Sequence, residues 1–246
     1  MNLESLLPET IATRVYAIAD IHGRLDLLIG LETTIRADLD ARPTAEPLIC
    51  YLGDYIDRGP ASAGVIRRLA AARQDEVRRV FLKGNHEDRM LAFMDDPVSN
   101  GPAWMNFGGR EALASYGVPE AETGRENWPL LRDRLAAALP PSHLDFLQNL
   151  QLAMRWGDYL FVHAGLNPAR DLADQDPHDL IWIREPFLSS DRNWGLRVVH
   201  GHVVVPEPVF RANRIGLDTG AYKSGVLTCA AMEGSDIRIL RGRGKP

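Results

Sequence analysis

The sequence predicts a mixed α/β (α+β) protein, and three observations lead to this fold class. Short apolar segments alternate with amphipathic segments through the first part of the chain. A stretch carrying Gly, Pro and Trp over residues 97–141 interrupts the alternation, and the last part holds short apolar segments separated by turn-forming pairs. With 246 residues, 45% of them hydrophobic and 25% charged, the chain can bury a sizeable core. We expect a single domain over residues 1–246.

The first part of the chain is expected to form parallel βαβ units. Its apolar segments are short and bounded by turn residues, which is typical of buried strands, and the segments between them have helical spacing of apolar residues. A chain that alternates strand and helix in this way places its strands in parallel. The expected strands are Arg14–Ala19, Pro47–Leu52 and Val77–Leu82, and the expected helices are Leu25–Leu39 and Ser62–Arg73.

Residues 97–141 are expected to form a helical insertion within this domain. The stretch is much longer than a usual connection of about 4–6 residues. Helix-like segments lie near Gly109–Tyr116 and Leu130–Leu139. Such an insertion could cover a functional site, and a plain connector is the alternative.

After the insertion, the pattern predicts antiparallel strands. Gly157-Asp158 is a turn-forming pair between two apolar segments, and Glu233-Gly234-Ser235 separates another two. Both arrangements are typical of hairpins. The expected strands are Leu150–Trp156, Tyr159–Val162, Arg197–His200, Val209–Leu217, Val226–Met232 and Ile237–Leu240.

Composition argues against several classes of protein. No apolar segment approaches the roughly 20 residues of a membrane-spanning helix, and the N-terminus lacks the basic and apolar regions of a secretory signal. The two cysteines, Cys50 and Cys229, make no disulfide framework. A net charge of −5, from 28 Lys and Arg against 33 Asp and Glu, argues against non-specific nucleic-acid binding. We therefore expect a cytoplasmic protein of enzyme size with no membrane or nucleic-acid partner.

Polar side chains follow directly after the three expected parallel strands. Asp20 and Asp54 are 34 residues apart, and Asp54 and Asn85 are 31 apart, which is about one βα unit each. Because the C-terminal ends of parallel strands meet at one edge of a sheet, where open α/β folds bind ligands, we expect these residues to converge. The segments are Asp20-Ile-His22-Gly, Gly53-Asp54-Tyr-Ile-Asp57-Arg58-Gly59 and Gly84-Asn85-His86-Glu87.

The side chains in these segments suit a metal centre. Carboxylate and amide oxygens with imidazole nitrogens and no thiolate favour Mn, Fe, Zn or Mg. His163 and His202 follow later apolar segments, and with them the chain has enough ligands for two metals that share one carboxylate. Two metals about 3.5–4 Å apart form a clamp for phosphoryl chemistry. Each signal alone has a plainer interpretation, since Asp20 could cap a helix and a lone histidine could belong to a core.

The order of the motifs is more specific than any one of them. ADIHG, GDYIDRG, GNHE, VHAG and HGHV occur in this order, and together they resemble the phosphoprotein phosphatase branch of the calcineurin-like metallophosphoesterases. The resemblance covers roughly residues 14–240. The segments 106–117 and 181–185, which include Arg184, are similar to features of the small bacterial serine/threonine protein phosphatases. The resemblance implies a central β-sandwich flanked by helices.

The resemblance also implies two divalent metal ions, with manganese favoured and Fe, Zn or Mg as alternatives. Water or hydroxide bridging the two metals would attack the phosphate directly, without a phosphoenzyme. The implied ligands are Asp20 and His22 for the first metal, Asp54 as the bridge, and Asn85, His163 and His202 for the second.

Four further residues have implied roles in catalysis and substrate binding. His86 would protonate the leaving oxygen, and Asp57 would orient its imidazole. Arg58 and Arg184 would bind the phosphate oxygens, because a planar guanidinium suits that geometry.

Some positions depart from the family pattern or have no motif role. Many metallophosphoesterases carry Gly-His-x-His, but this chain has Gly201-His202-Val203-Val204, so the first metal would have fewer protein ligands. The Thr-Pro that bacterial relatives often carry after the histidine is also missing. His200 is expected to be structural or to support the site, and His143 and His178 are expected on the surface. Glu87 is interpreted as a residue that favours a helix N-terminus.

The sequence therefore predicts a metal-dependent phosphomonoesterase that acts on phosphoserine or phosphothreonine, with phosphotyrosine left open. Its partner would be a phosphoprotein or a small phosphorylated substrate. A symmetrical dinucleoside tetraphosphatase (diadenosine tetraphosphate hydrolase) is the alternative, although that group usually lacks the second aspartate of the GDxxDRG motif. A non-catalytic scaffold on the same fold is the second alternative.

Overall fold

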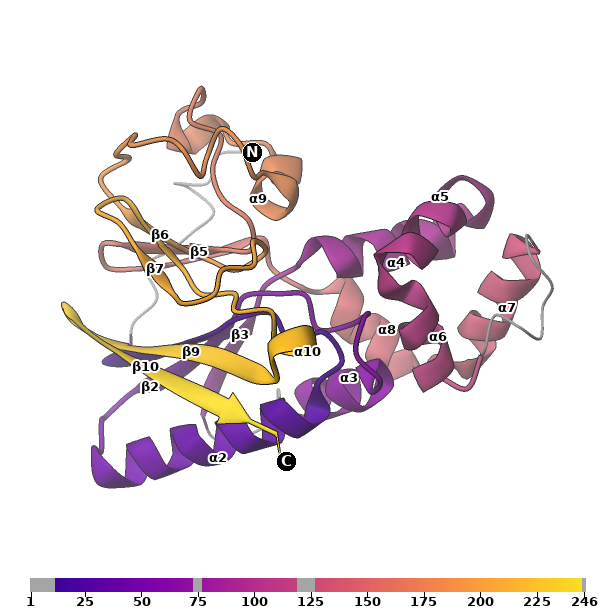
Figure 1. The fold of residues 1–246 in the computed structure, drawn as a ribbon, viewed down its shortest axis with the longest axis horizontal. Helices are drawn as coiled ribbons and strands as arrows, with labels where there is room; N and C mark the ends of the chain where they lie inside the picture. The colour runs from indigo at the N-terminus through magenta and orange to yellow at the C-terminus, as the bar shows by residue number, and fades with distance from the viewer. Residues whose placement is uncertain (1–11, 73–76, 119–126, 245–246) are drawn as a thin grey trace.

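The computed structural model describes residues 12–72, 77–118 and 127–244, which form two facing β-sheets flanked by helices (Figure 1). The first sheet has the strand order β10-β9-β1-β2-β3, and the second has the order β4-β5-β6-β8-β7. The predicted mixed α/β sandwich is therefore confirmed.

The first sheet follows the prediction closely. Its strands β1, β2 and β3 pair in parallel, and the hairpin of β9 and β10 pairs with β1 in the antiparallel sense. The helices α2 and α3 lie in the two crossovers between the parallel strands. The bounds are β1 Arg14–Ile18, α2 Leu25–Ala41, β2 Pro47–Tyr51, α3 Ser62–Ala71, β3 Arg78–Phe81, α10 Ala221–Ser224, β9 Val226–Glu233 and β10 Asp236–Arg243.

The second sheet is mixed, so the expectation of purely antiparallel strands is wrong. The predicted hairpin of β4 and β5 is present, but β5 pairs in parallel with β6, and β6 in parallel with β8. The segment expected as one strand over Val209–Leu217 forms the short hairpin of β7 and β8. The bounds are β4 Ala153–Trp156, β5 Tyr159–Val162, α9 Pro177–Trp182, β6 Arg197–His200, β7 Val209–Phe210 and β8 Arg214–Gly216.

Apolar side chains fill three layers, which explains how the two sheets face each other. On β1, Val15 and Ala17 point toward the second sheet and contact a cluster that includes Phe161, whereas Tyr16 and Ile18 belong to the cluster around α2. This alternation is the period of two that a strand buried on both faces requires. A third cluster packs α9 against the outer face of the second sheet.

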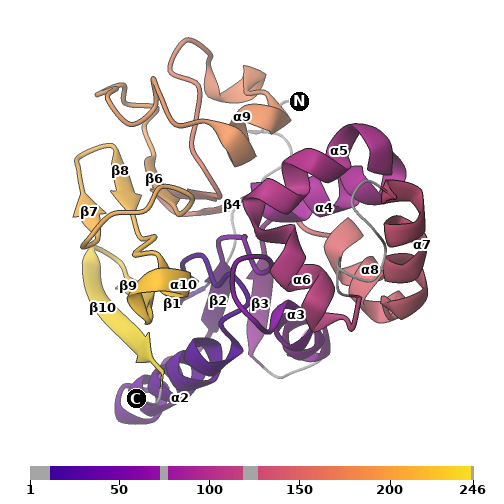
Figure 2. The ribbon, with the colours of Figure 1, turned by 45° about the vertical axis from the view of Figure 1, so that its right-hand side comes forward.

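A lobe of helices lies beside the sandwich (Figure 2). The predicted helical segments near 109–116 and 130–139 correspond to α6 and α7, the helix start inferred at Glu87 corresponds to α4, and α5 and α8 were not predicted. Throughout the described ranges, every helix is too short or too polar to cross a membrane. The bounds are α4 Asn85–Asp95, α5 Pro97–Trp104, a π-helical turn Met105–Gly109, α6 Arg110–Ser115, α7 Trp128–Ala138 and α8 Pro141–Gln148.

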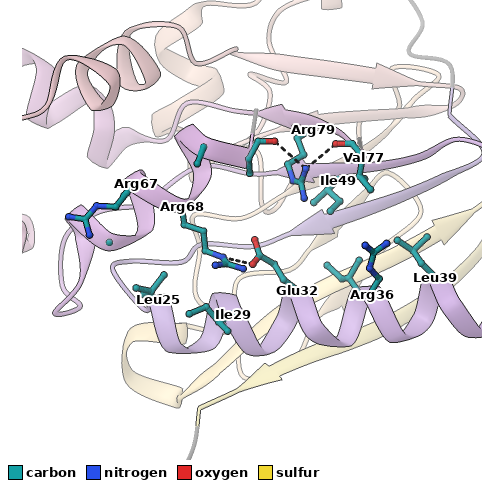
Figure 3. A pocket seen from close by; sticks show the side chains of 14 residues that line it. Leu25, Ile29, Glu32, Arg36, Leu39, Ile49, Arg67, Arg68, Val77 and Arg79 are labelled. Atoms are coloured by element: carbon teal, nitrogen blue, oxygen red, sulfur yellow. Dashed lines mark hydrogen bonds and ion pairs between the residues drawn. The ribbon is translucent and has the colours of Figure 1, made fainter. Parts of the chain in front are cut away.

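A groove of about 960 Å³ lies between α2 and α3, over Ile49 of β2 (Figure 3). Two of its arginines are engaged, because Arg68 pairs with Glu32 and Arg79 donates to the backbone carbonyls of residues 72 and 77. The groove contains none of the residues that the motifs single out, and it lies on the helix-covered face of the first sheet.

Asp38 of α2 fastens this helix to the first sheet. Its buried carboxylate accepts hydrogen bonds from Tyr16 Oη (2.8 Å), Arg42 Nη1 (2.7 Å), and Arg238 Nη1 and Nη2 (2.5 and 3.0 Å). The Arg238 guanidinium, together with these other partners, holds the pKa of Asp38 well below its usual range.

We expect Asp38→Asn to lower the free energy of unfolding by about 3 kcal/mol at neutral pH, because the buried Arg14, 3.6 Å away, and the partly buried Arg238 lose a counter-charge. The folded-state pKa of Asp38 lies below the unfolded value, so this contribution is complete above about pH 4 and declines as the pH falls. Urea unfolding of the wild type and of Asp38→Asn at several pH values measures this contribution to the free energy of unfolding. If the two proteins still differed by the same free energy of unfolding at about pH 2, the difference would not come from the ionised carboxylate of Asp38.

Candidate metal centre

The residues that the motifs single out lie at the ends of strands that share one edge of the sandwich. Asp20 and His22 follow β1, Asp54 follows β2, and Asn85 begins α4 directly after β3. The second sheet contributes in the same way, because β5 and β6 are parallel and are followed by His163 and His202. The structure brings these six side chains together.

Asp54 lies at the centre of this group. Its Oδ2 is 3.6 Å from His22 Nε2, and its Oδ1 is 3.4 Å from His163 Nε2. Two sets of side chains, each with ligand atoms within 4.8 Å of one another, could hold a metal ion. They are His22, Asp54 and His86, and Asp54, His163 and His202. Asp54 is the one residue common to both sets.

Asn85 belongs to the second set by position. Its Oδ1 is 3.0 Å from His163 Nε2 and 3.0 Å from His202 Nδ1. The Nδ1 atom of His163 lies 2.8 Å from the carbonyl oxygen of Leu52, to which it must donate, so its Nε2 carries a lone pair. That lone pair faces the Asn85 and Asp54 oxygens with no proton between them. This convergence of acceptors fits a cation.

Buried polar atoms without hydrogen-bond partners give a second test of whether this site suits a metal ion. Among the described residues, the buried atoms Asp20 Oδ1 and His202 Nε2 have no hydrogen-bond partner. Burial lowers the pKa of His22 and His163, and that of His202 to about 3, so the imidazoles are neutral, as metal ligands must be. Asp20 does not cap α2, whose N-cap is Arg24, so the helix-cap interpretation is wrong.

The backbone at the site is held in an uncommon conformation. In the part of the chain that the structure describes, the non-glycine residues with positive φ all belong to the expected site, with φ between 47° and 70°. Such conformations cost energy and persist only where surrounding contacts fix them. These residues are His22, Asp54, Asp57, Arg58 and His202.

Glu87 supplies part of that restraint. It is fully buried, and its carboxylate accepts the backbone N–H groups of Asp54 (3.0 Å), Tyr55 (2.8 Å) and Gly84 (3.0 Å). It therefore ties the loop after β2 to the start of α4, in addition to capping that helix. Gly84 itself must be glycine, because a Cβ there would lie 2.1 Å from Asp54 Oδ1.

His86 forms a buried pair with Asp57. Its Nδ1 lies 2.7 Å from Asp57 Oδ2, and Trp104 Nε1 donates to both Asp57 oxygens at 3.2 and 3.1 Å. Burial opposes the charged imidazole, but Asp54 and Asp57 outweigh it and raise the pKa of His86. Its Nε2 lies 3.8 Å from Asp54 Oδ2 and so faces the candidate metal ligands.

The 97–141 segment contributes directly to this site. Besides Trp104, its Gly108 accepts the backbone N–H of Arg58 at 3.2 Å, and a Cβ on Gly108 would lie 2.7 Å from that nitrogen. No spacing in the sequence pairs Trp104 with Asp57, because only the packing of α5 beside α4 brings them into contact.

Of the two predicted phosphate-binding arginines, Arg58 contacts a candidate metal ligand directly. Arg58 Nη1 is 2.9 Å from His22 Nε2, and its guanidinium lies 4.8 Å from the centre of the Tyr222 ring. His22 Nδ1 is paired with the carbonyl of Ile56 at 2.9 Å, so Nε2 accepts from the arginine. Arg184 is exposed, and its charge contributes to the low pKa of His202.

Aromatic rings border the centre. The Tyr222 ring makes an edge contact with His22, at 5.3 Å between centroids, and Phe107 makes one with His86 at 5.7 Å. Arg89 lies between Phe107 and Trp182, at 5.1 and 4.7 Å from their centres.

The three histidines without a proposed role in the site differ in their exposure to solvent. His143, expected on the surface, is only 3% exposed, because α8 packs inward and the Nδ1 atom lies 3.0 Å from Tyr116 Oη. His178 is exposed, as predicted. His200 is buried, with its Nδ1 atom 3.0 Å from the carbonyl oxygen of Gly201.

The sandwich carries, at one edge, two sets of candidate metal ligands that share one aspartate, an arrangement suited to a metal-dependent phosphoesterase. The chain belongs to the calcineurin-like phosphoesterase family, whose model matches residues 13–224. The family that the motifs resemble is therefore confirmed.

Similar proteins include both a tetraphosphatase and protein phosphatases. The chain is 24% identical over 232 residues to the asymmetrical bis(5′-nucleosyl)-tetraphosphatase PrpE of Anoxybacillus flavithermus, covering 86% of this chain and 87% of the relative. It is 26% identical over 231 residues to serine/threonine-protein phosphatase 1 of Salmonella typhimurium, covering 89% and 92%. The fold is similar to a crystal structure of a cold-active protein-tyrosine phosphatase from a psychrophilic Shewanella species, with a TM-score of 0.59 and 18% identity, covering 96% and 80%.

Proposed function

We propose that this protein hydrolyses phosphoserine and phosphothreonine monoesters with two divalent metal ions, manganese being the favoured metal. The observation that carries the proposal is the position of Asp54, which belongs to both sets of metal-binding side chains and lies beside the His86–Asp57 pair. Phosphotyrosine is included as a further substrate class.

The proposed ligands are those placed together at the strand ends. Asp20, His22 and Asp54 would hold the first ion, and Asp54 would also serve the second, with Asn85, His163 and His202. When bound, the two ions would supply a water activated for direct attack on phosphorus and would neutralise charge on the phosphate.

Side chains of the protein would donate the proton to the leaving group and bind the phosphate. With Nδ1 bonded to Asp57, His86 can donate a proton from Nε2 to the leaving oxygen. Trp104 keeps the Asp57 carboxylate aimed at the imidazole. Arg58 must leave His22 Nε2 when a metal binds there, and its guanidinium is then available for the phosphate oxygens, as is that of Arg184. We propose that the 97–141 insertion acts as part of this active site.

A dinucleoside tetraphosphatase is the second candidate. The rings of Phe107 and Tyr222, each in edge contact with a histidine of the centre, support a substrate with a planar base, and a relative matched over most of the chain is named as a tetraphosphatase. The Asp57–Trp104 contact favours the monoesterase, because it equips His86 to protonate a poor leaving group such as serine.

The test is a substrate panel assayed with Mn²⁺. It contains phosphoserine, phosphothreonine and phosphotyrosine peptides, mononucleotides and dinucleoside tetraphosphates. We expect the phosphopeptides to be the best substrates, and a parallel Asp54→Ala preparation controls for contaminating phosphatases. Fast cleavage of the dinucleotides with inert phosphopeptides would establish the second candidate instead. Absence of both bound metal and nitrophenyl phosphate hydrolysis would point to the non-catalytic scaffold.

A further inference from the structure

Asp218 reaches the metal centre by the same route as the predicted ligands. It lies just after β8, which is parallel to β6, so it emerges at the edge of the second sheet that also carries His163 and His202. The predicted strand Val209–Leu217 ends immediately before it, but Asp218 is placed at this edge only by the parallel pairing of β8 with β6, which the sequence did not predict.

The Asp218 carboxylate is buried and only half satisfied. The residue is 1% exposed, and its Oδ1 accepts the backbone N–H of Gly220 at 2.8 Å. Its Oδ2 has no hydrogen-bond partner among the described residues. A buried oxygen that accepts no hydrogen bond, as Asp218 Oδ2 does here, raises the free energy of the folded protein.

The carboxylate of Asp20 is also buried with only one of its oxygens hydrogen-bonded. It is also 1% exposed, its Oδ2 accepts the His202 backbone N–H at 2.9 Å, and its Oδ1 is unpartnered. The backbone brings the two residues close together, because Thr219 Oγ1, next to Asp218, is 2.7 Å from Thr228 Oγ1, and the Thr228 carbonyl accepts the N–H of Ala19, next to Asp20, at 3.0 Å. Two buried carboxylates, each with an unpaired oxygen, repel each other unless a proton or a cation lies between them.

We propose that Asp218 is an additional ligand of the first metal position, so that an ion held by Asp20, His22 and Asp54 has a third carboxylate beside it. This inference rests on the proposed metal-dependent function. It accounts for the missing histidine of the Gly201-His202-Val203-Val204 segment by a carboxylate from the neighbouring strand. Three carboxylates and one imidazole favour Mn²⁺ or Mg²⁺ at this position over softer ions.

The test is metal binding by Asp218→Asn, measured by titration calorimetry with Mn²⁺ and by elemental analysis after dialysis. Asparagine keeps an oxygen for the Gly220 N–H group, so the local turn is preserved. We expect affinity at the first position to fall at least about tenfold, with the second ion retained. Asp158→Asn, which removes the same charge from an exposed turn at the opposite end of β5, is the matched control and should leave both affinities unchanged.

Thermal melting separates this role from a structural one. In EDTA-treated Asp218→Asn protein, the introduced amide would donate to Asp20 Oδ1 and remove the repulsion, so we expect Tm to rise by roughly 2–4 °C. The increase in Tm on adding Mn²⁺ should be smaller than in the wild type. A purely structural Asp218 would instead lower Tm in both conditions.

The outcomes also separate this inference from the proposed function. If the wild type binds two ions and Asp218→Asn binds them equally well, the ligand assignment is wrong while the proposed function stands. If the wild type binds no Mn²⁺, both are wrong.

Discussion

Replacing His86 with asparagine should lower the rate of phosphoserine peptide hydrolysis by roughly 10²–10⁴ while the bound metal is retained. The reason is the geometry of the buried pair. Asp57 fixes Nδ1 of His86 at 2.7 Å, and the raised pKa of His86 keeps a proton on the ring for a leaving alkoxide. Asparagine cannot supply that proton. Steady-state kinetics with peptides and with aryl phosphates measure the effect.

The leaving group provides the internal control. A nitrophenolate leaves without protonation, so the same variant should be much closer to the wild type with nitrophenyl phosphate. His178→Asn, at an exposed position, serves as the matched control for loss of an imidazole. An equal loss with both kinds of substrate, accompanied by loss of metal, would show that His86 is a ligand of the set that includes His22 and Asp54.

The fold was predictable where local signals decide strand direction. Arg14–Ile18, Pro47–Tyr51 and Arg78–Phe81 are short apolar segments separated by single helices, and such spacing leaves parallel pairing as the natural arrangement. The direction of β6 was not predicted, because apolar character says nothing about which neighbour a strand takes. The long connection from Val162 to Arg197, which excludes a tight hairpin, was the available signal.

The sequence likewise predicted some residues of the candidate site and missed others. Asp20, Asp54 and Asn85 could be placed together from the sequence because each follows a parallel strand, and chain direction alone makes them converge. Trp104 could not be placed, since its contact with Asp57 depends on how α5 packs beside α4. The role of Glu87 was predicted only in part, because helix capping is local but its bonds to the loop after β2 are not.

Asp54→Asn should reduce metal content from about two ions per chain toward none, because one carboxylate serves both proposed positions. Its Oδ2 faces His22 and its Oδ1 faces His163, so the negative charge is shared between the two sets of ligands. Asp54 is buried, but the His86 imidazole, whose raised pKa keeps it protonated, lies 3.8 Å from Asp54 Oδ2 and favours the charged carboxylate. Elemental analysis after dialysis against a defined Mn²⁺ concentration measures the loss.

The matched control is Asp20→Asn, which removes the same charge from a residue that is proposed to serve the first ion alone. It should lose about one ion and keep the one near His163 and His202. Asparagine at position 54 retains an oxygen for the His86 backbone N–H, which Asp54 Oδ1 accepts at 3.1 Å, so the start of α4 should remain folded. If Asp54→Asn lost only one ion while the Asp20 variant lost the other, each aspartate would belong to a single site and the bridging role would be wrong.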